Sequence, residues 1–242
     1  MRHNSIPMIR FGSGAHAIKG SMNFPGTINQ YYLTIPNDID LRMGTGDFTI
    51  EFFAYYNTSL VGAYPRFFSM GAHPSASIAV DLENDGNLYF YFNSYNSGNG
   101  FILGAPEIAT FQNRWSHYAF VRSSGTISGY INGTRQTNVW SDVNSSAAHT
   151  DATNVLTIGN EDVTGSTPFQ AEFGGPMTNF RWTKGLALYA GPSFVTPTSP
   201  LTALSSTKLL ILANNGLPFV DSSAIPKTIT NVSVPWSVLT PF

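Results

Sequence analysis

Apolar and polar residues alternate along most of this chain with a period of two, which is the pattern of half-buried β-strands. Residues 48–56 (FTIEFFAYY) and 115–121 (WSHYAFV) are the clearest examples. No window keeps the helical period of 3.6 for longer than a turn or two. The pattern therefore predicts β-strands at residues 21–24, 31–35, 48–56, 66–70, 77–82, 87–92, 115–121, 126–131, 135–140, 155–159, 173–184 and 208–212.

Turn residues separate these runs at short intervals. Residues 84–86 (Asn-Asp-Gly) and 132–133 (Asn-Gly) carry the signal of tight β-hairpins, because their backbones readily adopt positive φ angles. The polar residues 144–153 are expected to form a surface loop. About a dozen strands at 8–12-residue spacing predict an antiparallel β-sandwich or jelly roll, and the lack of a fixed repeat argues against a propeller or solenoid. We expect one domain at residues 21–242, preceded by an N-terminal arm at residues 1–20.

The composition of the chain excludes several classes of protein and partner. Only 11% of the 242 residues are charged and the net charge is −2, so neither nucleic acid nor a membrane surface is an expected partner. Aromatic residues make up 14% of the chain, which excludes intrinsic disorder. The absence of cysteine excludes disulfides, and no apolar run has the length of a signal peptide or a membrane span.

The low charge also suggests a role for the strand faces that point away from the core. These faces are expected to carry Ser, Thr, Asn and Tyr instead of Lys and Glu, and such surfaces suit permanent protein neighbours or sugars. We therefore expect the chain to bury a stable interface, of roughly 1,200–2,000 Å² or more, on assembly.

Six short motifs are similar, in order and spacing, to the concanavalin A-like lectin/glucanase superfamily, and within it to the laminin-G-like domain. The resemblance implies a jelly roll of two antiparallel sheets, which generally binds glycans or proteins. The motifs are residues 48–53 (FTIEFF), 67–71 (FFSMG), 115–122 (WSHYAFVR), 129–133 (GYING), 156–159 (LTIG) and 177–182 (MTNFRW).

The C-terminal part extends this resemblance. Residues 184–189 (KGLALY), 207–210 (TKLL), 221–223 (DSS) and the terminal Pro-Phe resemble the extended domain of structural proteins in tailed phages and large algal DNA viruses. The resemblance implies a non-enzymatic virion protein on the particle surface, in a capsid, tail or fibre, with other virion proteins or copies of itself as neighbours and host cell-surface glycans as ligands. The alternatives are a free-standing, extracellular carbohydrate-binding lectin and, with less support, a glycoside hydrolase.

Catalytic residues are not evident. The glucanases of the superfamily carry a Glu-x-Asp-x-x-Glu string, because retaining hydrolysis needs two carboxylates about 5–5.5 Å apart. The nearest match here is Asp81 and Glu83, with Asp85 in a predicted turn. A Gly-x-Ser-x-Gly nucleophile motif is also missing, so we expect no enzymatic activity.

The resemblance raises calcium as a candidate cofactor, since laminin-G-like domains sometimes hold this ion at the rim. The candidate ligands are Asn160, Glu161 and Asp162, which follow a predicted strand, and a second group is Asp81, Glu83 and Asp85. The five histidines lack zinc spacing. His117, within a predicted strand, is expected to be a hydrogen-bonded structural residue.

Sugar binding usually needs an aromatic ring for the apolar sugar face and amides or carboxylates for the hydroxyls. Aromatic residues are so abundant that core packing or an intersubunit contact is the favoured interpretation of any single one. The candidates in loops and at strand ends are Tyr64, Tyr95, Asn96, Asn99, Trp140 and Asp142.

Overall fold

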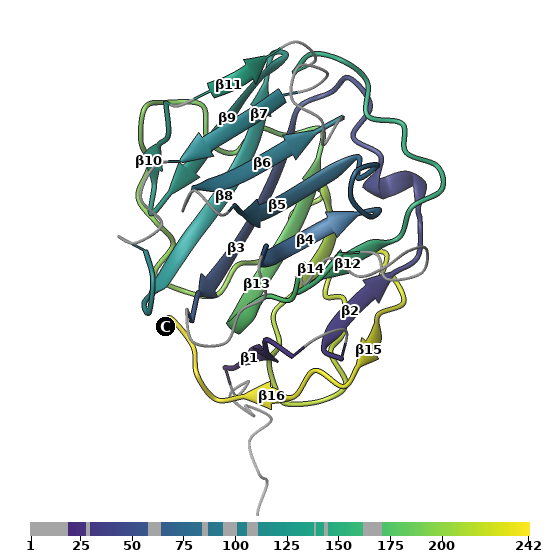
Figure 1. Ribbon diagram of the computed structural model, residues 1–242, viewed down its shortest axis with the longest axis vertical. Helices are drawn as coiled ribbons and strands as arrows, with labels where there is room; N and C mark the ends of the chain where they lie inside the picture. The colour runs from purple at the N-terminus through teal and green to yellow at the C-terminus, as the bar shows by residue number, and fades with distance from the viewer. Residues whose placement is uncertain are drawn as a thin grey trace, which may run out of the picture.

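Two antiparallel β-sheets face each other in the computed structural model, which describes residues 19–27, 30–57, 64–83, 87–93, 101–105, 111–137, 139–142, 145–161 and 171–242. For residues 101–105 and 139–142 the description covers the backbone alone. In Figure 1 the layers overlap, so that β4 to β6 of one sheet cross β3, β8 and β13 of the other. The predicted all-β sandwich is confirmed.

Each sheet has eight strands among the described residues. The first sheet has the order β10-β9-β8-β3-β13-β1-β16, with β14 also paired to β13, and the second has the order β11-β7-β6-β5-β4-β12-β2-β15. The first sheet comprises β1 (Ser21–Pro25), β3 (Phe48–Tyr55), β8 (Trp115–Ser123), β9 (Thr126–Ile131), β10 (Thr134–Arg135), β13 (Gly174–Lys184), β14 (Thr207–Ile211) and β16 (Trp236–Ser237). The second comprises β2 (Tyr32–Ile35), β4 (Arg66–Met70), β5 (Ile78–Leu82), β6 (Leu88–Phe92), β7 (Phe101–Ala105), β11 (Val139–Asp142), β12 (Leu156–Ile158) and β15 (Thr230–Val232).

Helical structure is limited to one 3₁₀ turn, η1 (Ile39–Leu41), in the described part of the chain. Asp38 caps this turn, because its side chain accepts a hydrogen bond from the N–H of Asp40 at 2.8 Å. No helix among the described residues is long and apolar enough to cross a membrane.

The core lies between the sheets and is rich in phenylalanine. On β3, Phe48, Ile50 and Phe52 point inward and are fully buried, while the residues between them point outward. Phe52 stacks on Tyr118 of β8 at 5.3 Å and on Phe180 of β13 at 5.9 Å between ring centroids. The alternation seen in the sequence is therefore the alternation between the core and the outer face of the sheet.

One predicted strand is wrong. Residues 135–140 do not continue the hairpin after 132–133; instead β10 has two residues, and the chain crosses to the second sheet, where β11 pairs with β7. The physical reason is that residues 135–138 are all polar and offer nothing to the core. The turn itself is as predicted, with φ values of 49° at Asn132 and 76° at Gly133. The hairpin turn predicted at residues 84–86 lies outside the described residues.

After β13 the chain folds back over part of the outer face of the first sheet. We call residues 185–201 the strap. Its Tyr189 and Phe194 stack on each other and pack on Tyr130 of β9, on the outer face of the first sheet. The Tyr130 hydroxyl donates a hydrogen bond to the Gly191 carbonyl at 2.9 Å, which fixes the strap to β9.

A buried carboxylate joins the strap to three strands. Glu51 of β3 is fully buried and accepts hydrogen bonds from Arg181 Nε at 2.9 Å, from His117 Nε2 at 3.0 Å and from the Tyr189 hydroxyl at 2.9 Å. Burial by itself raises the pKa of Glu51, but the His117 hydrogen bond and the Arg181 charge outweigh it, so the pKa lies below its usual value. His117 is thus the structural histidine expected. The expectation of an uncharged outer face is wrong for these strands.

This cluster leads to a stability prediction. Replacing Glu51 with Gln leaves Arg181 buried without its counter-ion, so E51Q should lower the free energy of unfolding by about 3–5 kcal/mol. The Y189F variant removes one hydrogen bond and should cost about 1 kcal/mol. Urea unfolding followed by tryptophan fluorescence measures both.

The matched control is Asp38→Asn. The Asp38 carboxylate is 39% exposed and lies 3.5 Å from Lys227, and asparagine can also cap η1, so this variant should change stability by less than about 1 kcal/mol. Equal effects of E51Q and D38N would contradict the role given to the buried cluster.

Candidate functional site

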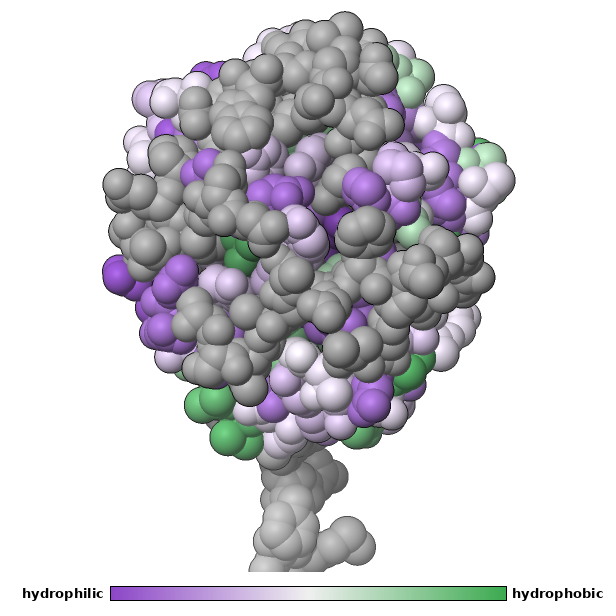
Figure 2. Space-filling model, viewed as in Figure 1, coloured by the Kyte–Doolittle hydropathy of each residue, from purple (hydrophilic) through white to green (hydrophobic). Residues whose placement is uncertain are grey.

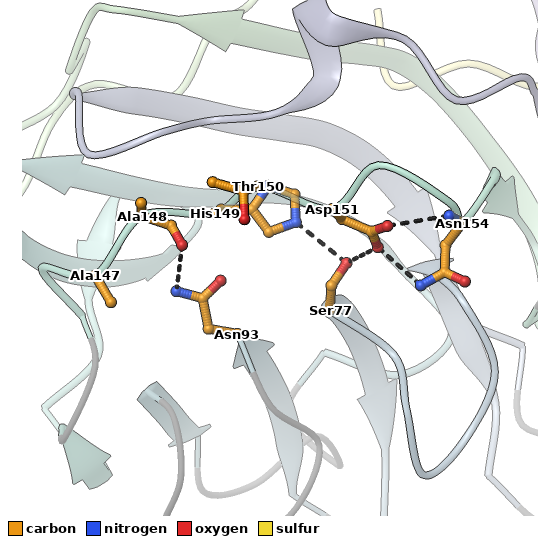
Figure 3. Close-up of a pocket in the computed structure, with 8 residues that line it drawn as sticks. All are labelled: Ser77, Asn93, Ala147, Ala148, His149, Thr150, Asp151 and Asn154. Carbon is orange, nitrogen blue, oxygen red and sulfur yellow. Dashed lines mark hydrogen bonds between the residues drawn. The ribbon is translucent and has the colours of Figure 1, made fainter.

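A polar pocket of about 420 Å³ opens at one end of the second sheet (Figure 3). Ser77 stands just before β5, Asn93 just after β6, and the remaining wall comes from the chain between β11 and β12. The strands bring these positions together because Ile78 pairs with Phe92. The lining residues are Ser77, Asn93, Ala147, Ala148, His149, Thr150, Asp151 and Asn154.

Local backbone geometry shapes two walls of the pocket. Asn93 ends β6 with a φ of 62°, and its N–H donates to the Ser77 carbonyl at 2.7 Å. Asp151 forms a side-chain turn, because its Oδ1 accepts from the N–H groups of Thr153 and Asn154, each at 3.0 Å. The Asn37 side chain donates to the Asn154 carbonyl at 2.7 Å and holds this turn against the residues that follow β2.

Arg122 of β8 supports the pocket from inside the protein. Its side chain is fully buried, and the guanidinium lies about 5 Å from the ring centroids of Phe48 and Phe92. All its hydrogen bonds among the described residues go to backbone carbonyls of two segments. These carbonyls belong to Met43, Gly44, Gly46, Ser145 and Ala147, at distances between 2.5 and 3.4 Å. The Arg122 guanidinium therefore joins the segment before β3 to the segment that forms the pocket wall.

His149 is the centre of a directed chain of hydrogen bonds. Its Nδ1 accepts from the N–H of Met43 at 3.3 Å, so the imidazole proton is on Nε2. Nε2 then donates to Ser77 Oγ at 3.1 Å, and Ser77 Oγ donates to Asp151 Oδ2 at 2.5 Å (Figure 3). The pocket floor is therefore fixed by bonds that all point toward Asp151.

Burial sets the protonation state of His149, and hydrogen bonds set that of Asp151. It lowers the pKa of His149 to about 4, with a further contribution from the nearby Arg122 charge, so the imidazole is neutral near pH 7. Burial also raises the pKa of Asp151, but hydrogen bonds from Ser77 and Asn154 outweigh this, so its pKa lies below the usual value and it is ionised.

Ser77, His149 and Asp151 resemble a serine-hydrolase triad in composition but not in geometry. A general base must accept the serine proton at Nε2 and donate from Nδ1 to the carboxylate. In this pocket Nε2 donates to Ser77, while Nδ1 accepts from a backbone N–H. The arrangement can orient and hold polar groups, but His149 does not take the place of the triad histidine, and the Ser77 hydroxyl donates to Asp151 instead.

Of the predicted sugar-binding residues in the described part of the chain, Tyr64 and Asp142 lie toward opposite ends of the second sheet. Asp142 pairs with Phe101, which pairs with Phe92, so the end of β11 lies at the same end of the sheet as the pocket. Tyr64 precedes Arg66, which pairs with Asp81 near the opposite end. For Trp140 and Asp142 the structure gives the backbone alone. Tyr95, Asn96 and Asn99 lie outside the described residues.

The predicted calcium ligands lie beside a buried ion pair. Glu161 is 4% exposed, and its Oε2 accepts from Arg66 Nη1 at 2.5 Å and from the N–H of His73 at 3.0 Å. Asn160 accepts from the N–H of Glu161, and Asp162 lies outside the described residues. No group of three His, Cys, Asp or Glu side chains suited to a metal occurs in the described ranges. Calcium at Asn160, Glu161 and Asp162 stays a prediction.

Asp81 and Glu83, from the second group of predicted calcium ligands, also have structural partners. Arg66 Nη2 lies 2.9 Å from Asp81 Oδ2, and the Tyr91 hydroxyl donates to Glu83 at 3.1 Å. Asp85 lies outside the described residues.

Sequence reasoning missed the pocket residues. Residues 144–153 were expected to form a surface loop, but His149 within them is buried. The signal available was local: Asp151 followed by Thr153 and Asn154 is typical of a side-chain turn. Its contacts with Ser77 and Met43 are long-range and leave no sequence pattern.

The chain belongs to the concanavalin A-like lectin/glucanases superfamily, whose laminin-G-type sequence profile matches residues 26–184. This match covers the region in which the six motifs lie. A search of curated protein sequences found no match.

Solved structures with the same fold include three from different organisms. A putative carbohydrate-binding protein from Bacteroides ovatus has a TM-score of 0.56 at 16% identity, over 92% of this chain and 62% of its own. A heptameric SAP-like pentraxin from Limulus polyphemus has a TM-score of 0.52 at 18% identity, over 71% and 78%. The mouse laminin α1 LG4-5 domains have a TM-score of 0.50 at 18% identity, over 75% and 49%. These similarities establish the lectin-like fold.

The buried His149 leads to a pH prediction. Its pKa of about 4 lies below the value of 6.5 for an exposed histidine, so His149 contributes stability above about pH 6.5 that is lost as the pH falls toward 4. The wild type should lose about 3 kcal/mol of unfolding free energy between pH 7 and pH 4 through this residue alone.

His149→Gln keeps an amide that can donate to Ser77 but does not titrate. Urea unfolding at pH 7, 6, 5 and 4 should therefore show a shallower pH dependence for H149Q than for the wild type. Parallel curves for the two proteins would show that His149 is not the buried neutral group described.

Proposed function

We propose that the protein is a non-catalytic, lectin-like module that binds glycans through the pocket between Ser77, Asn93 and residues 147–154, and that it works on the surface of a virion. The observation that carries glycan binding is the rigid polar pocket, whose wall is held by Arg122 and whose floor is ordered by the His149 hydrogen-bond chain. Preorganised hydrogen-bonding groups bind hydroxyls with little ordering cost.

The same geometry supports the absence of catalysis. His149 is not a general base for Ser77, because its Nε2 donates to the Ser77 hydroxyl. Asp81 pairs with Arg66, and Glu83 accepts from Tyr91, so these carboxylates already have structural partners. The proposal therefore assigns binding alone to the pocket.

The virion role is supported by the C-terminal part of the chain. Residues 184–242 resemble the C-terminal part of structural proteins in tailed phages and large algal viruses. Figure 2 shows a face on which the hydrophobic residues lie mainly toward the rim. The exposed large hydrophobic residues after β13 are Leu186, Val195, Leu217, Val220, Ile225, Val238 and Leu239. Such side chains suit contacts with virion neighbours or with other copies of the chain.

A free-standing carbohydrate-binding lectin is the second candidate. It is favoured by the fold match to the putative carbohydrate-binding protein from Bacteroides ovatus, which extends over 92% of this chain. Mass spectrometry of purified particles separates the two candidates. Stoichiometric amounts in particles are expected for the virion protein, and absence from them would favour the free lectin.

The pocket leads to a binding prediction. Asn93 has a φ of 62°, so Asn93→Gly removes the side chain without backbone strain and should weaken binding to the glycans selected on an array by about tenfold. Surface plasmon resonance with the best array glycan measures the change.

Asn215→Gly is the matched control, since Asn215 has a φ of 64° and lies in the turn after β14, outside the pocket. Its affinity should equal that of the wild type. Loss of binding in both variants, or in neither, would place the sugar site elsewhere.

A further inference from the structure

We infer that the pocket selects neutral glycans and discriminates against acidic ones such as sialylated, uronic or sulfated sugars. This inference rests on the proposed function, because it specifies the ligand class of the same pocket. It follows from how the charges of Asp151, in the pocket lining, and of Arg122, behind it, are used within the protein.

Asp151 is the one charged side chain in the described pocket lining at neutral pH. Both of its oxygens are occupied: Oδ1 accepts from the N–H groups of Thr153 and Asn154, and Oδ2 accepts from Ser77 Oγ and Asn154 Nδ2. The carboxylate therefore has little capacity left for ligand hydroxyls, but its negative charge remains in the wall.

Arg122 is a cation behind the pocket wall, and its guanidinium is engaged within the protein. It is fully buried, stacks near Phe48 and Phe92, and donates to five backbone carbonyls. A guanidinium surrounded in this way cannot form the paired hydrogen bonds by which arginine recognises a carboxylate or a sulfate.

The groups left for a ligand in the described lining are uncharged. The side-chain oxygens of Asn93 and Asn154 carry no hydrogen bond from the described residues, and Thr150 is exposed at the pocket. Figure 3 shows Asn93 and Asn154 on opposite sides of His149 and Ser77. Amide and hydroxyl groups match the donors and acceptors of sugar hydroxyls.

Electrostatics then sets the discrimination. An acidic group about 4 Å from Asp151 weakens binding by roughly fivefold even with water-like screening, and by more where water is excluded. No cation in the described lining offsets this repulsion, since His149 is neutral and both of its ring nitrogens already have hydrogen-bond partners.

The test is a glycan array of matched pairs, in which each neutral glycan is printed beside the same glycan capped with sialic acid or sulfate. The wild type should bind the neutral member of a pair at least about fivefold more tightly. Thr150→Lys places a cation at the pocket and should raise the relative binding of the acidic member by about three- to tenfold, in a salt-dependent manner.

Thr198→Lys, at an exposed position of the strap, is the charge-matched control and should leave the preference unchanged. Acidic members bound as tightly as neutral ones by the wild type, with binding lost in Asn93→Gly, would overturn neutral selectivity while leaving glycan binding at the pocket intact. No binding to any glycan, by a wild type with a cooperative unfolding transition, would overturn the proposed function as well.

Discussion

The guanidinium of Arg122 is the contact on which the pocket depends. It emerges from β8, at the centre of the first sheet, and its hydrogen bonds reach the carbonyls of residues 43–46 and 145–147. The Met43 N–H that orients His149 belongs to the first of these segments, and the pocket wall begins in the second. A neutral side chain at this position would leave several buried carbonyls without donors, which is costly in a protein interior. The site is thus built on the sandwich and not on a loop alone.

Two other buried charged residues, Glu51 and Arg66, also join separate segments of the chain. Glu51 joins β3, β8, β13 and the strap, and Arg66 joins β4 to Asp81 of β5 and to Glu161 after β12. In both clusters a buried charge joins residues that lie far apart in the sequence. The low charge of the sequence therefore has a second meaning, since several of the few charged side chains are internal and tie the chain to itself.

Much of the fold could be predicted from sequence, because period-two alternation directly reports which side of a strand faces the core. It located β3, β8 and β13, and the motifs they carry identified the superfamily. It failed at residues 135–140, where polar residues interrupt the pattern and the chain changes sheets.

The pocket could not be predicted in the same way. Ser77, Asn93 and His149 are far apart in sequence, and the register of β5 with β6 together with Arg122 brings them close. No sequence pattern shows that His149 donates from Nε2 and accepts at Nδ1, the reverse of the order in a catalytic triad. None of the six sugar-binding candidates is among the described lining residues, and Tyr95, Asn96 and Asn99 lie outside the described part of the chain.

The most direct test is a crystal structure of the protein bound to a neutral oligosaccharide chosen on a glycan array. The account predicts that the sugar lies in the pocket, with its hydroxyls within hydrogen-bonding distance of Asn93 and Asn154 and with Arg122 still bonded to its carbonyls. A sugar bound at another surface, with the pocket filled by water alone, would contradict it.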